Sequence, residues 1–387
     1  MKKKISILGS TGSIGTTLLN IINNDKKNFD ILLLTANKDY LTLLKQAKNF
    51  NVKNLIINDI NNYKILKKKC KNLKIKVYNN FDRLDKIFRK KNDYVMSSIT
   101  GIEGLIPTIN IIKFTKQIAI ANKESIICGW NLIKKELEKN KTKFIPVDSE
   151  HFSIWYALKN ISTQSINKIY LTASGGPLNE LSKTEIKNIK ISQTLNHPNW
   201  KMGKKISIDS ATLMNKIFEI IEAKNIFNIS YKKLDILIHP KSYIHAIIKF
   251  NDGLIKIVAH DTTMKIPIFN TLYLNTGKIL KTKKLNTDIL NDLRLKKVDH
   301  KKFPLANIIP FLPENFSLFE TVIVSANDEL VDLYLKKKIK FNEISTKLMK
   351  LIKLKEFNKF KKISPKNIES IMKLNEYVRL KVNSKSI

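Results

Sequence analysis

Two acidic groups far apart in the chain could together bind a divalent metal ion. The first is Asp148-Ser149-Glu150, which follows a short apolar run that is predicted to be a buried strand. In an extended segment, residues two apart point the same way, so Asp148 and Glu150 would present both carboxylates to one side. The second is Glu219, on a predicted amphipathic helix. Hard cations such as Mg²⁺ and Mn²⁺ prefer oxygen ligands, so the pattern predicts a three-carboxylate metal site.

Each acidic group taken alone could instead be an ordinary set of solvent-exposed charges. A D-x-E pair alone is weak evidence, because many such pairs are solvated loop charges, and charges on an isolated helix are usually a solvated face. The presence of both acidic groups in one chain favours a metal site over solvent-exposed charges. Zinc is not indicated, because the sequence contains no H-E-x-x-H motif and no paired Cys/His spacing.

The segment that contains Glu219 also carries groups that suit a phosphate. A short β-like run at 206–208 leads to Asp209-Ser210, which is a helix N-cap signature. The helix predicted to follow begins with Asn215 and Lys216 on its polar side. A helix N-terminus that bears Ser210, Asn215 and Lys216 suits a phosphate, because backbone N–H groups and the helix dipole favour an anion.

The amino terminus predicts a dinucleotide-binding turn. Residues 3–8 form a short predicted strand, residues 9–15 a glycine-rich turn and residues 16–23 a helix. This order places backbone N–H groups around a pyrophosphate. The spacing G-x-x-G-x-x-G departs from the usual G-x-G-x-x-G, so the motif alone is an imperfect match. After the next strand, at 31–34, Lys38 favours the 2′-phosphate of NADPH, whereas the neighbouring Asp39 would favour a ribose hydroxyl.

Composition excludes several classes of protein. The chain has 387 residues and 43% hydrophobic residues, enough for two or three domains. The net charge of +37 would suit nucleic acid, but lysines are spread through every segment, so nucleic acid is not expected as a partner. Two cysteines suit a reducing compartment. No apolar run is long enough for a signal peptide or a membrane span, and a cytoplasmic protein is expected.

The order of predicted elements gives the fold class. Strands alternate with helices in the first part, including strands at 55–57, 94–96 and 117–120, which predicts a doubly wound, Rossmann-like parallel sheet. Strands at 168–172, 234–238 and 243–250 predict an α+β catalytic domain, and the pattern beyond Pro304 predicts a C-terminal α-helical bundle. The predicted domains are 1–147 for NADPH, 148–275 for metal and substrate, 276–300 as a connector and 301–387 as the helical domain.

Taken together, the motifs resemble the 1-deoxy-D-xylulose 5-phosphate reductoisomerase family. They run in family order over nearly the whole chain: 9–15 (GSTGSIG), 121–125 (ANKES), 146–151 (PVDSEH), 171–177 (LTASGGP), 197–222, and 238–242 (IHPKS) with His245. Each motif is modest alone, and the set is highly specific. The resemblance implies an enzyme that isomerises and reduces the sugar phosphate to 2-C-methyl-D-erythritol 4-phosphate, in the methylerythritol phosphate route to isoprenoids. The implied cofactors are NADPH and Mg²⁺, Mn²⁺ or Co²⁺, and a homodimer is expected.

The resemblance also implies residue roles. The implied metal ligands are Asp148, Glu150 and Glu219. The implied contacts to substrate oxygens are Lys123, Ser149 and Glu150. The remaining substrate contacts, chiefly to the phosphate, are Ser174, His197, Ser210, Asn215 and Lys216. The implied nucleotide contacts are Thr11, Gly12, Ser13, Ile14, Asn122, Glu124 and Gly203, together with Asn37 and Lys38 at the second strand. Trp200 and Met202 are expected on a mobile flap at 197–205, and His239 and His245 are either ligands or histidines packed beside their strands.

Two departures from the family pattern bear on affinity. The family usually has a Gly-Lys-Asn-like turn after the second strand, where this chain has Asn37-Lys38-Asp39. Asn tolerates positive φ better than most residues, so the turn can survive. The family also tends to show Pro-Asp-Met-Arg before a Pro-Ile pair, where this chain has Thr262-Thr263-Met264-Lys265.

Two competing functions belong to other classes. A plain NADP-dependent dehydrogenase or semialdehyde dehydrogenase would share the first domain without needing three carboxylates, and would rely on Cys128 or a histidine. Its activity would survive excess EDTA. A basic nucleic-acid-binding protein would explain the charge but not the ordered motifs, and it would bind DNA with a steep salt dependence.

Overall fold

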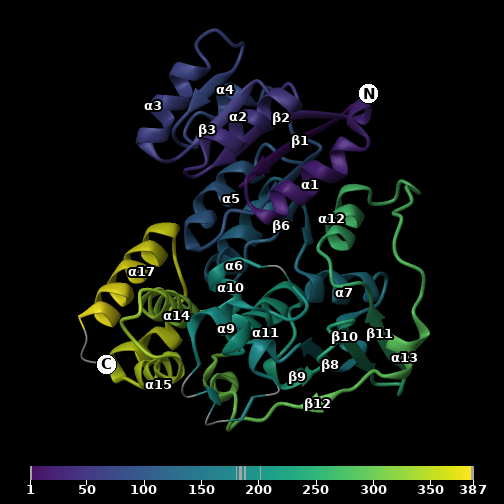
Figure 1. Cartoon of the computed structure of the whole chain (residues 1–387), viewed down its shortest axis with the longest axis vertical. Coiled ribbons are helices and arrows are strands. Elements are labelled where there is room, and N and C mark those ends of the chain that lie inside the picture. Colours follow the sequence, from purple (N-terminus) through teal and green to yellow (C-terminus); the bar gives the residue numbers. More distant parts are fainter. Residues whose placement is uncertain (1, 180, 183–184, 187–188, 201, 385–387) are drawn as a thin grey trace. The chain divides into compact units, whose positions relative to one another are not determined.

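The computed structural model describes residues 2–179, 181–182, 185–186, 189–200 and 202–384. Lys201, inside the predicted flap, lies outside this set, as do both ends of the chain. The chain forms two compact units (Figure 1). The first contains Met1–Ser125, Leu132–Phe152 and Met264–Lys281, and the second contains Ile126–Asn131, Ser153–Thr263 and Thr282–Ile387.

The described part of the first unit contains a seven-stranded sheet in the order β4-β3-β2-β1-β5-β6-β7. Every neighbouring pair is parallel. The strands are β1 (Lys3–Leu8), β2 (Phe29–Ala36), β3 (Asn54–Ile57), β4 (Lys76–Tyr78), β5 (Tyr94–Ser97), β6 (Gln117–Ile120) and β7 (Lys143–Pro146). The helices within this unit are α1 (Ser13–Asn23), α2 (Tyr40–Asn49), α3 (Ile60–Lys69), α4 (Leu84–Ile87), α5 (Leu105–Ile112) and α12 (Lys265–Leu272). The predicted doubly wound parallel sheet is confirmed.

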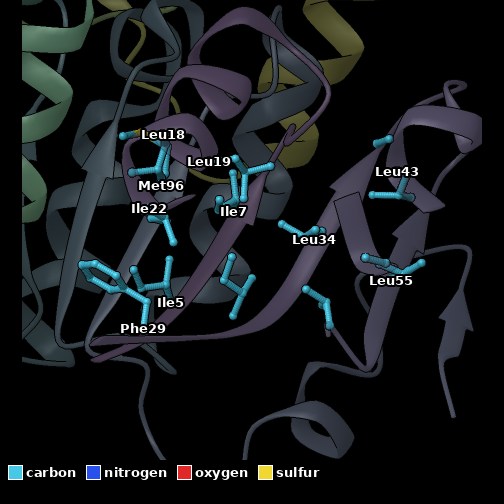
Figure 2. Packing of buried hydrophobic residues seen from close by; sticks show 14 of the residues in the cluster. Ile5, Ile7, Leu18, Leu19, Ile22, Phe29, Leu34, Leu43, Leu55 and Met96 are labelled. Atoms are coloured by element: carbon cyan, nitrogen blue, oxygen red, sulfur yellow. The ribbon is translucent and has the colours of Figure 1, made fainter. Parts of the chain in front are cut away.

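One apolar core holds α1 and α2 against this sheet. Ile5 and Ile7 of β1 face Leu18 and Ile22 of α1, and Figure 2 shows the same cluster continuing across β2 to Leu43 of α2. The inner strands, such as β5 and β6, are buried on both faces, as expected for a parallel sheet covered by helices, so they are nearly continuous apolar runs. The core therefore fixes the carboxyl ends of β1 and β2, where the glycine-rich turn and the Lys38 turn begin.

The second unit contains a mixed five-stranded sheet in the order β11-β10-β8-β9-β12. β8 and β9 are parallel and the other pairs are antiparallel. The strands are β8 (Ile166–Ala173), β9 (Leu234–Ile238), β10 (Ile244–Phe250), β11 (Ile255–Ala259) and β12 (Lys296–Lys297). The associated helices are α9 (Ile191–Leu195), α10 (Lys204–Ala211), α11 (Met214–Phe227) and α13 (Thr287–Asn291). The predicted α+β region is confirmed.

The described part of the C-terminal region is mainly helical, as predicted. Helices α14 (Phe319–Leu335), α15 (Phe341–Leu351), α16 (Lys355–Asn358) and α17 (Ile368–Asn383) follow one another. α14 packs against α15 and α17, and the three helices lie together in Figure 1. Two further helices, α6 (Lys123–Lys139) and α7 (Ser149–Ala157), include residues of both compact units. In the described residues, no helix is both long and apolar enough to cross a membrane.

Two predictions of extended backbone were wrong. The predicted β-like run at 206–208 lies inside helix α10. In a helix, residues two apart face different directions, and accordingly Ile208 is buried while Ile206 is 39% exposed. The segment from Asp148 to Glu150 is not extended either, because β7 ends at Pro146 and α7 begins at Ser149. The backbone carbonyl of Asp148 accepts the N–H of Phe152 at 2.7 Å, which starts the helix.

Candidate active site

The glycine-rich turn after β1 has the geometry of a dinucleotide-binding loop. Gly9 has a φ of +81°, which favours glycine. A Cβ at Gly15 would lie 2.5 Å from both the carbonyl oxygen of Gly9 and the Cα of Ser10, so only glycine lets α1 pack this closely on the turn. Gly12 is the N-cap of α1 and is exposed. The predicted nucleotide contacts Thr11, Gly12, Ser13 and Ile14 therefore lie at an accessible helix N-terminus, where an anion is favoured.

The turn after β2 separates the roles of Lys38 and Asp39. The side chain of Asp39 accepts the backbone N–H of Thr42 at 3.0 Å and thereby caps α2. Asn37 and Lys38 are exposed. The nearby Asp59 has a lowered pKa, caused first by a hydrogen bond from the backbone of Asn62 and also by the charge of Lys38. The carboxylate of Asp39 is thus engaged by its own helix, which leaves Lys38 as the cation of this turn that suits a 2′-phosphate.

Replacing Lys38 with alanine should weaken NADPH binding and leave NADH binding nearly unchanged. A charge-assisted hydrogen bond contributes about 1.5–3 kcal/mol, so the preference for NADPH should fall about tenfold to hundredfold. Asp39→Asn should increase the preference slightly, because it removes a negative charge beside the 2′-phosphate, and the turn should survive because Asn also caps helices. Dissociation constants for both nucleotides test this, with Lys45→Ala on the exposed side of α2 as control. A wild type that binds both nucleotides equally would contradict this assignment.

Asn122 has a positioning role. It is 2% exposed and caps α6, because its side-chain oxygen accepts the N–H of Ser125 at 2.5 Å. Its amide nitrogen donates to the carbonyls of Ile99 and Gly101, in the loop after β5. Asn122 therefore ties this loop to the start of α6, next to Lys123 and Glu124.

The first unit brings four of the predicted substrate and metal residues together. Asp148 follows the end of β7, and Lys123 in the first turn of α6 forms an ion pair with it. The ring of His151, which is fully buried, has Nδ1 3.7 Å from the other oxygen of Asp148. The hydroxyl of Ser149 donates to Glu150 at 2.6 Å. The predicted carboxylate pair is thus held at the start of α7 beside a lysine.

The second unit brings the third predicted carboxylate to two polar neighbours. Glu219 on α11 is 1% exposed. Lys216, 4% exposed, forms an ion pair with it, and the amide of Asn215 donates to it. A buried carboxylate is stable only when it is paired and hydrogen-bonded. Glu219 is therefore a buried, hydrogen-bonded carboxylate and not a solvent-exposed surface charge.

A left-handed residue links the two helices that carry the predicted phosphate contacts. Leu213, at φ +66°, stands between α10 and α11. The predicted single helix after Asp209-Ser210 was therefore wrong: Ser210 lies in the last turn of α10, while Asn215 and Lys216 lie in the first turn of α11. A left-handed conformation costs a residue with a side chain about 1–2 kcal/mol. The surrounding packing must compensate for this cost, since Leu213 is buried.

Hydrogen bonds around His197 fix the direction in which Ser174 donates. His197 Nδ1 accepts the backbone N–H groups of Asn199 and Trp200, at 3.1 and 3.0 Å. Its proton is then on Nε2, which donates to the hydroxyl of Ser174 at 3.0 Å. The same hydroxyl accepts the N–H of Gly176 at 2.9 Å. With its oxygen accepting two bonds, Ser174 has its own hydrogen left to donate to an anion.

The loop that carries Ser174 lies close to Ser210. A Cβ at Gly176 would be 2.9 Å from the carbonyl oxygen of Ser210, so glycine is needed for this approach. The second unit therefore brings Ser174 and His197 toward the α10–α11 turn. It gathers the five predicted phosphate-contact residues around two loops and a helix start.

His197 should titrate well below neutral pH. Burial lowers its pKa from 6.5 to about 4, because it disfavours the charged ring. Between these values the unfolded chain binds the proton and the folded chain does not, so stability should fall as pH falls from about 6.5 toward 4. The C2 proton resonance, identified by its loss in His197→Gln, should show no inflection above about pH 5. A midpoint near 6.5 would contradict the hydrogen-bond direction assigned to Ser174.

Trp200 of the predicted flap packs against the first of two stacked histidines. Trp200 is half-buried and meets the ring of His245 edge-on, with centroids 6.2 Å apart. His245 stacks on His260 at 3.7 Å and its Nε2 lies 3.2 Å from the carbonyl oxygen of His260. His245 is 2% exposed, so its place is that of a packed histidine under Trp200. Gly203, the exposed N-cap of α10, ends this segment.

Sequence reasoning missed two positioning residues in the second unit. The amide of Asn199 donates to the carbonyl of Pro240 at 2.6 Å and to the hydroxyl of Ser242 at 3.0 Å. It thereby ties the His197 loop to the loop after β9. Asn327 of α14 donates to Asp209 at 2.7 Å. The position of Asn199 inside a matched motif could have indicated the first, whereas no local pattern marks Asn327.

Comparisons with known proteins agree over the whole chain. A family model described as 1-deoxy-D-xylulose 5-phosphate reductoisomerase matches residues 5–129. Models of the C-terminal domains of the same enzyme match residues 144–227 and 261–381. The 1-deoxy-D-xylulose 5-phosphate reductoisomerase of Pelagibacter ubique (strain HTCC1062) is 60% identical over 387 residues, which is 100% of both chains. That of Clostridium kluyveri is 37% identical and covers 97% of this chain and 98% of its own.

Solved structures give the same result. The enzyme from Zymomonas mobilis in complex with NADPH is similar with a TM-score of 0.87 and 28% identity, over 100% of both chains. A DOX-P reductoisomerase in complex with NADPH, fosmidomycin and magnesium reaches a TM-score of 0.90 with 29% identity, over 98% of this chain and 97% of that one. With full-length identity of 60% to a curated relative, this chain belongs to the 1-deoxy-D-xylulose 5-phosphate reductoisomerase family.

Proposed function

We propose that this chain converts 1-deoxy-D-xylulose 5-phosphate to 2-C-methyl-D-erythritol 4-phosphate through the residues described above. The reaction is that of its family, an isomerisation followed by a reduction in the methylerythritol phosphate pathway. It uses NADPH and a divalent metal, and relatives of known structure are complexes with NADPH and with magnesium. The observation that supports the assignment most is the pair of hydrogen bonds that leaves the Ser174 hydroxyl hydrogen able to donate, on a loop that approaches the Ser210 carbonyl closely.

The proposed metal ligands are Asp148, Glu150 and Glu219. Three carboxylates suit Mg²⁺, and Mn²⁺ or Co²⁺ could serve as well. The three ligands suit a hard cation, because all of them offer carboxylate oxygens. Asp148 and Glu219 each form an ion pair with a lysine, Lys123 and Lys216 respectively. When bound, the metal supplies Lewis-acid polarisation of a substrate carbonyl.

The proposed roles of the protein's other groups are binding and orientation. Ser174, Ser210, Asn215 and Lys216 donate to the phosphate, and His197 holds Ser174 in its donating direction. The glycine turn and Lys38 bind the nucleotide, which supplies the reducing hydride when bound.

Three further side chains act at the reacting end of the substrate. Lys123 and Ser149 contact the substrate's oxygens beside Asp148 and Glu150. Trp200, on the segment that begins at His197, covers the bound substrate and excludes water.

The direct test is an assay with 1-deoxy-D-xylulose 5-phosphate, NADPH and Mg²⁺ that follows the loss of NADPH absorbance. Activity should disappear in excess EDTA and return with Mg²⁺ or Mn²⁺. Activity that survives EDTA would instead support a plain NADP-dependent dehydrogenase. We further propose a homodimer in the cytoplasm, which analytical ultracentrifugation and cell fractionation would test.

A further inference from the structure

A buried hydrogen bond joins the C-terminal helical bundle to helix α10, next to the proposed phosphate site. Asn327 on α14 is fully buried and donates from Nδ2 to Oδ1 of Asp209 at 2.7 Å. Asp209 is 2% exposed and immediately precedes Ser210 in the last turn of α10. A side chain more than a hundred positions away in sequence therefore holds the turn on which Ser210 stands.

The second oxygen of Asp209 is held from its own helix. Lys205, one turn earlier on α10, lies 3.1 Å from Oδ2 of Asp209 and 2.9 Å from Oδ1 of Asp328 on α14. One oxygen of Asp209 is thus fixed by an amide of α14 and the other by a lysine shared with α14. These contacts set how the last turn of α10 lies on the bundle.

The turn that these contacts hold is the point where the phosphate residues converge. After Ser210 the chain passes through left-handed Leu213 into the first turn of α11, which carries Asn215 and Lys216. A small rotation of α10 would move Ser210 relative to both of them and relative to the Ser174 loop, which approaches the Ser210 carbonyl closely.

Packing alone does not account for an amide at this position. The side-chain oxygen of Asn327 is buried and has no hydrogen-bond partner among the residues that the structure describes. A buried polar atom without a partner destabilises the fold, so an apolar side chain would serve the core better. What Asn327 provides is a single directed bond to Asp209.

We propose that Asn327 is a positioning residue for the substrate's phosphate, acting through Asp209 on Ser210 and on the start of α11. The proposal rests on the proposed function of this site. It places a determinant of substrate affinity in the C-terminal helical bundle, on a residue that need not touch the substrate.

The test compares Asn327→Leu with Asn375→Leu. Asn375 is a matched control because it is 5% exposed, lies on α17 of the same bundle and also has a side-chain oxygen without a hydrogen-bond partner among the described residues. Losing the bond to a charged group should raise the KM for the sugar phosphate about tenfold to hundredfold in Asn327→Leu. The KM for NADPH should stay within about twofold, and the control should change neither constant.

Inorganic phosphate gives a readout that does not depend on turnover. Its dissociation constant, measured by calorimetry on the whole protein, should rise in Asn327→Leu and not in Asn375→Leu. This measurement also separates the two proposals: a wild type that binds phosphate but does not turn over the substrate would contradict the proposed function and leave this inference standing.

A swapped pair tests the direction of the bond. Asn327→Asp places two carboxylates together and should weaken phosphate binding, and adding Asp209→Asn should restore it, because the pair then bonds in reverse. If Asn327→Leu does not fold, the smaller polar variant Asn327→Ser replaces it in every comparison. Unchanged phosphate affinity with a lowered melting temperature, or equal losses in both variants, would show that Asn327 is only structural.

Discussion

Replacing Asp148, Glu150 or Glu219 with alanine should lower kcat by about a thousandfold or more while NADPH binding stays largely intact. A metal ion acting as a Lewis acid contributes several kcal/mol to the transition state, and each 1.36 kcal/mol corresponds to a factor of ten in rate. The nucleotide is expected at the glycine turn after β1, apart from these carboxylates in sequence and in role.

Stability has to be separated from catalysis in this series. Removing Glu219 breaks its ion pair with Lys216, which is 4% exposed, and breaking a buried pair can cost about 3–5 kcal/mol. Glu219→Gln keeps the shape, and its single amide oxygen can still accept one of the two hydrogen bonds that Asn215 and Lys216 donate to Glu219. It should therefore be less destabilised than Glu219→Ala and still be inactive. Glu138→Ala, at an exposed acid on α6, is the neutral control. Near wild-type turnover in any ligand variant would remove that residue from the metal site.

Gly15→Ala should weaken NADPH binding strongly and destabilise the first unit. The added Cβ would lie 2.5 Å from two backbone atoms of the turn, and backbone cannot give way as a flexible side chain can. Overpacking of this kind costs about 1–3 kcal/mol. Because the turn itself must move, the N–H groups that would bind the pyrophosphate should lose their alignment, with a loss in NADPH affinity of about a hundredfold.

Gly12→Ala is the matched control for this effect. A Cβ at Gly12 would meet only the carbonyl oxygen of Gly9, at 3.5 Å, which is ordinary contact. Its melting temperature should stay close to that of the wild type, so any loss of NADPH affinity would report on close approach of the nucleotide. Tight NADPH binding by Gly15→Ala, measured by fluorescence titration, would show that the turn does not bind the nucleotide.

The strands could be predicted where they are buried. β6 and β9 were predicted with their exact bounds, because β6 is a short apolar run and the buried residues of β9 alternate with less buried ones. β11 was not predicted, and its residues are mostly exposed, so it has no buried face to produce an alternating pattern. β4 and β12 have three and two residues, too few for any periodicity.

The site residues could be predicted by type but not by local geometry. The start of α11 was predicted too early because the rule looks for a capping side chain, and the N-cap here is Leu213, which offers none. The prediction that Asp148 to Glu150 are extended was wrong, because it assumed that the strand continues beyond Pro146, where β7 ends. Asn327 could not be predicted at all, because its role depends on how α14 packs against α10, and that contact is set by tertiary structure.

Helix α12 has a consequence for how the protein is made. Ile268 and Leu272 belong to the same core as Ile5, and Thr271 shares a hydrogen bond with the hydroxyl of Tyr94 at 2.9 Å. The ribosome must therefore extend the chain by about 120 residues past Phe152, on the order of ten seconds of synthesis, before the first unit has all of its core. Until then the apolar surface that α12 covers is open to chaperones and to other nascent chains, so the amino-terminal half of this enzyme cannot complete its folding as an independent domain during translation.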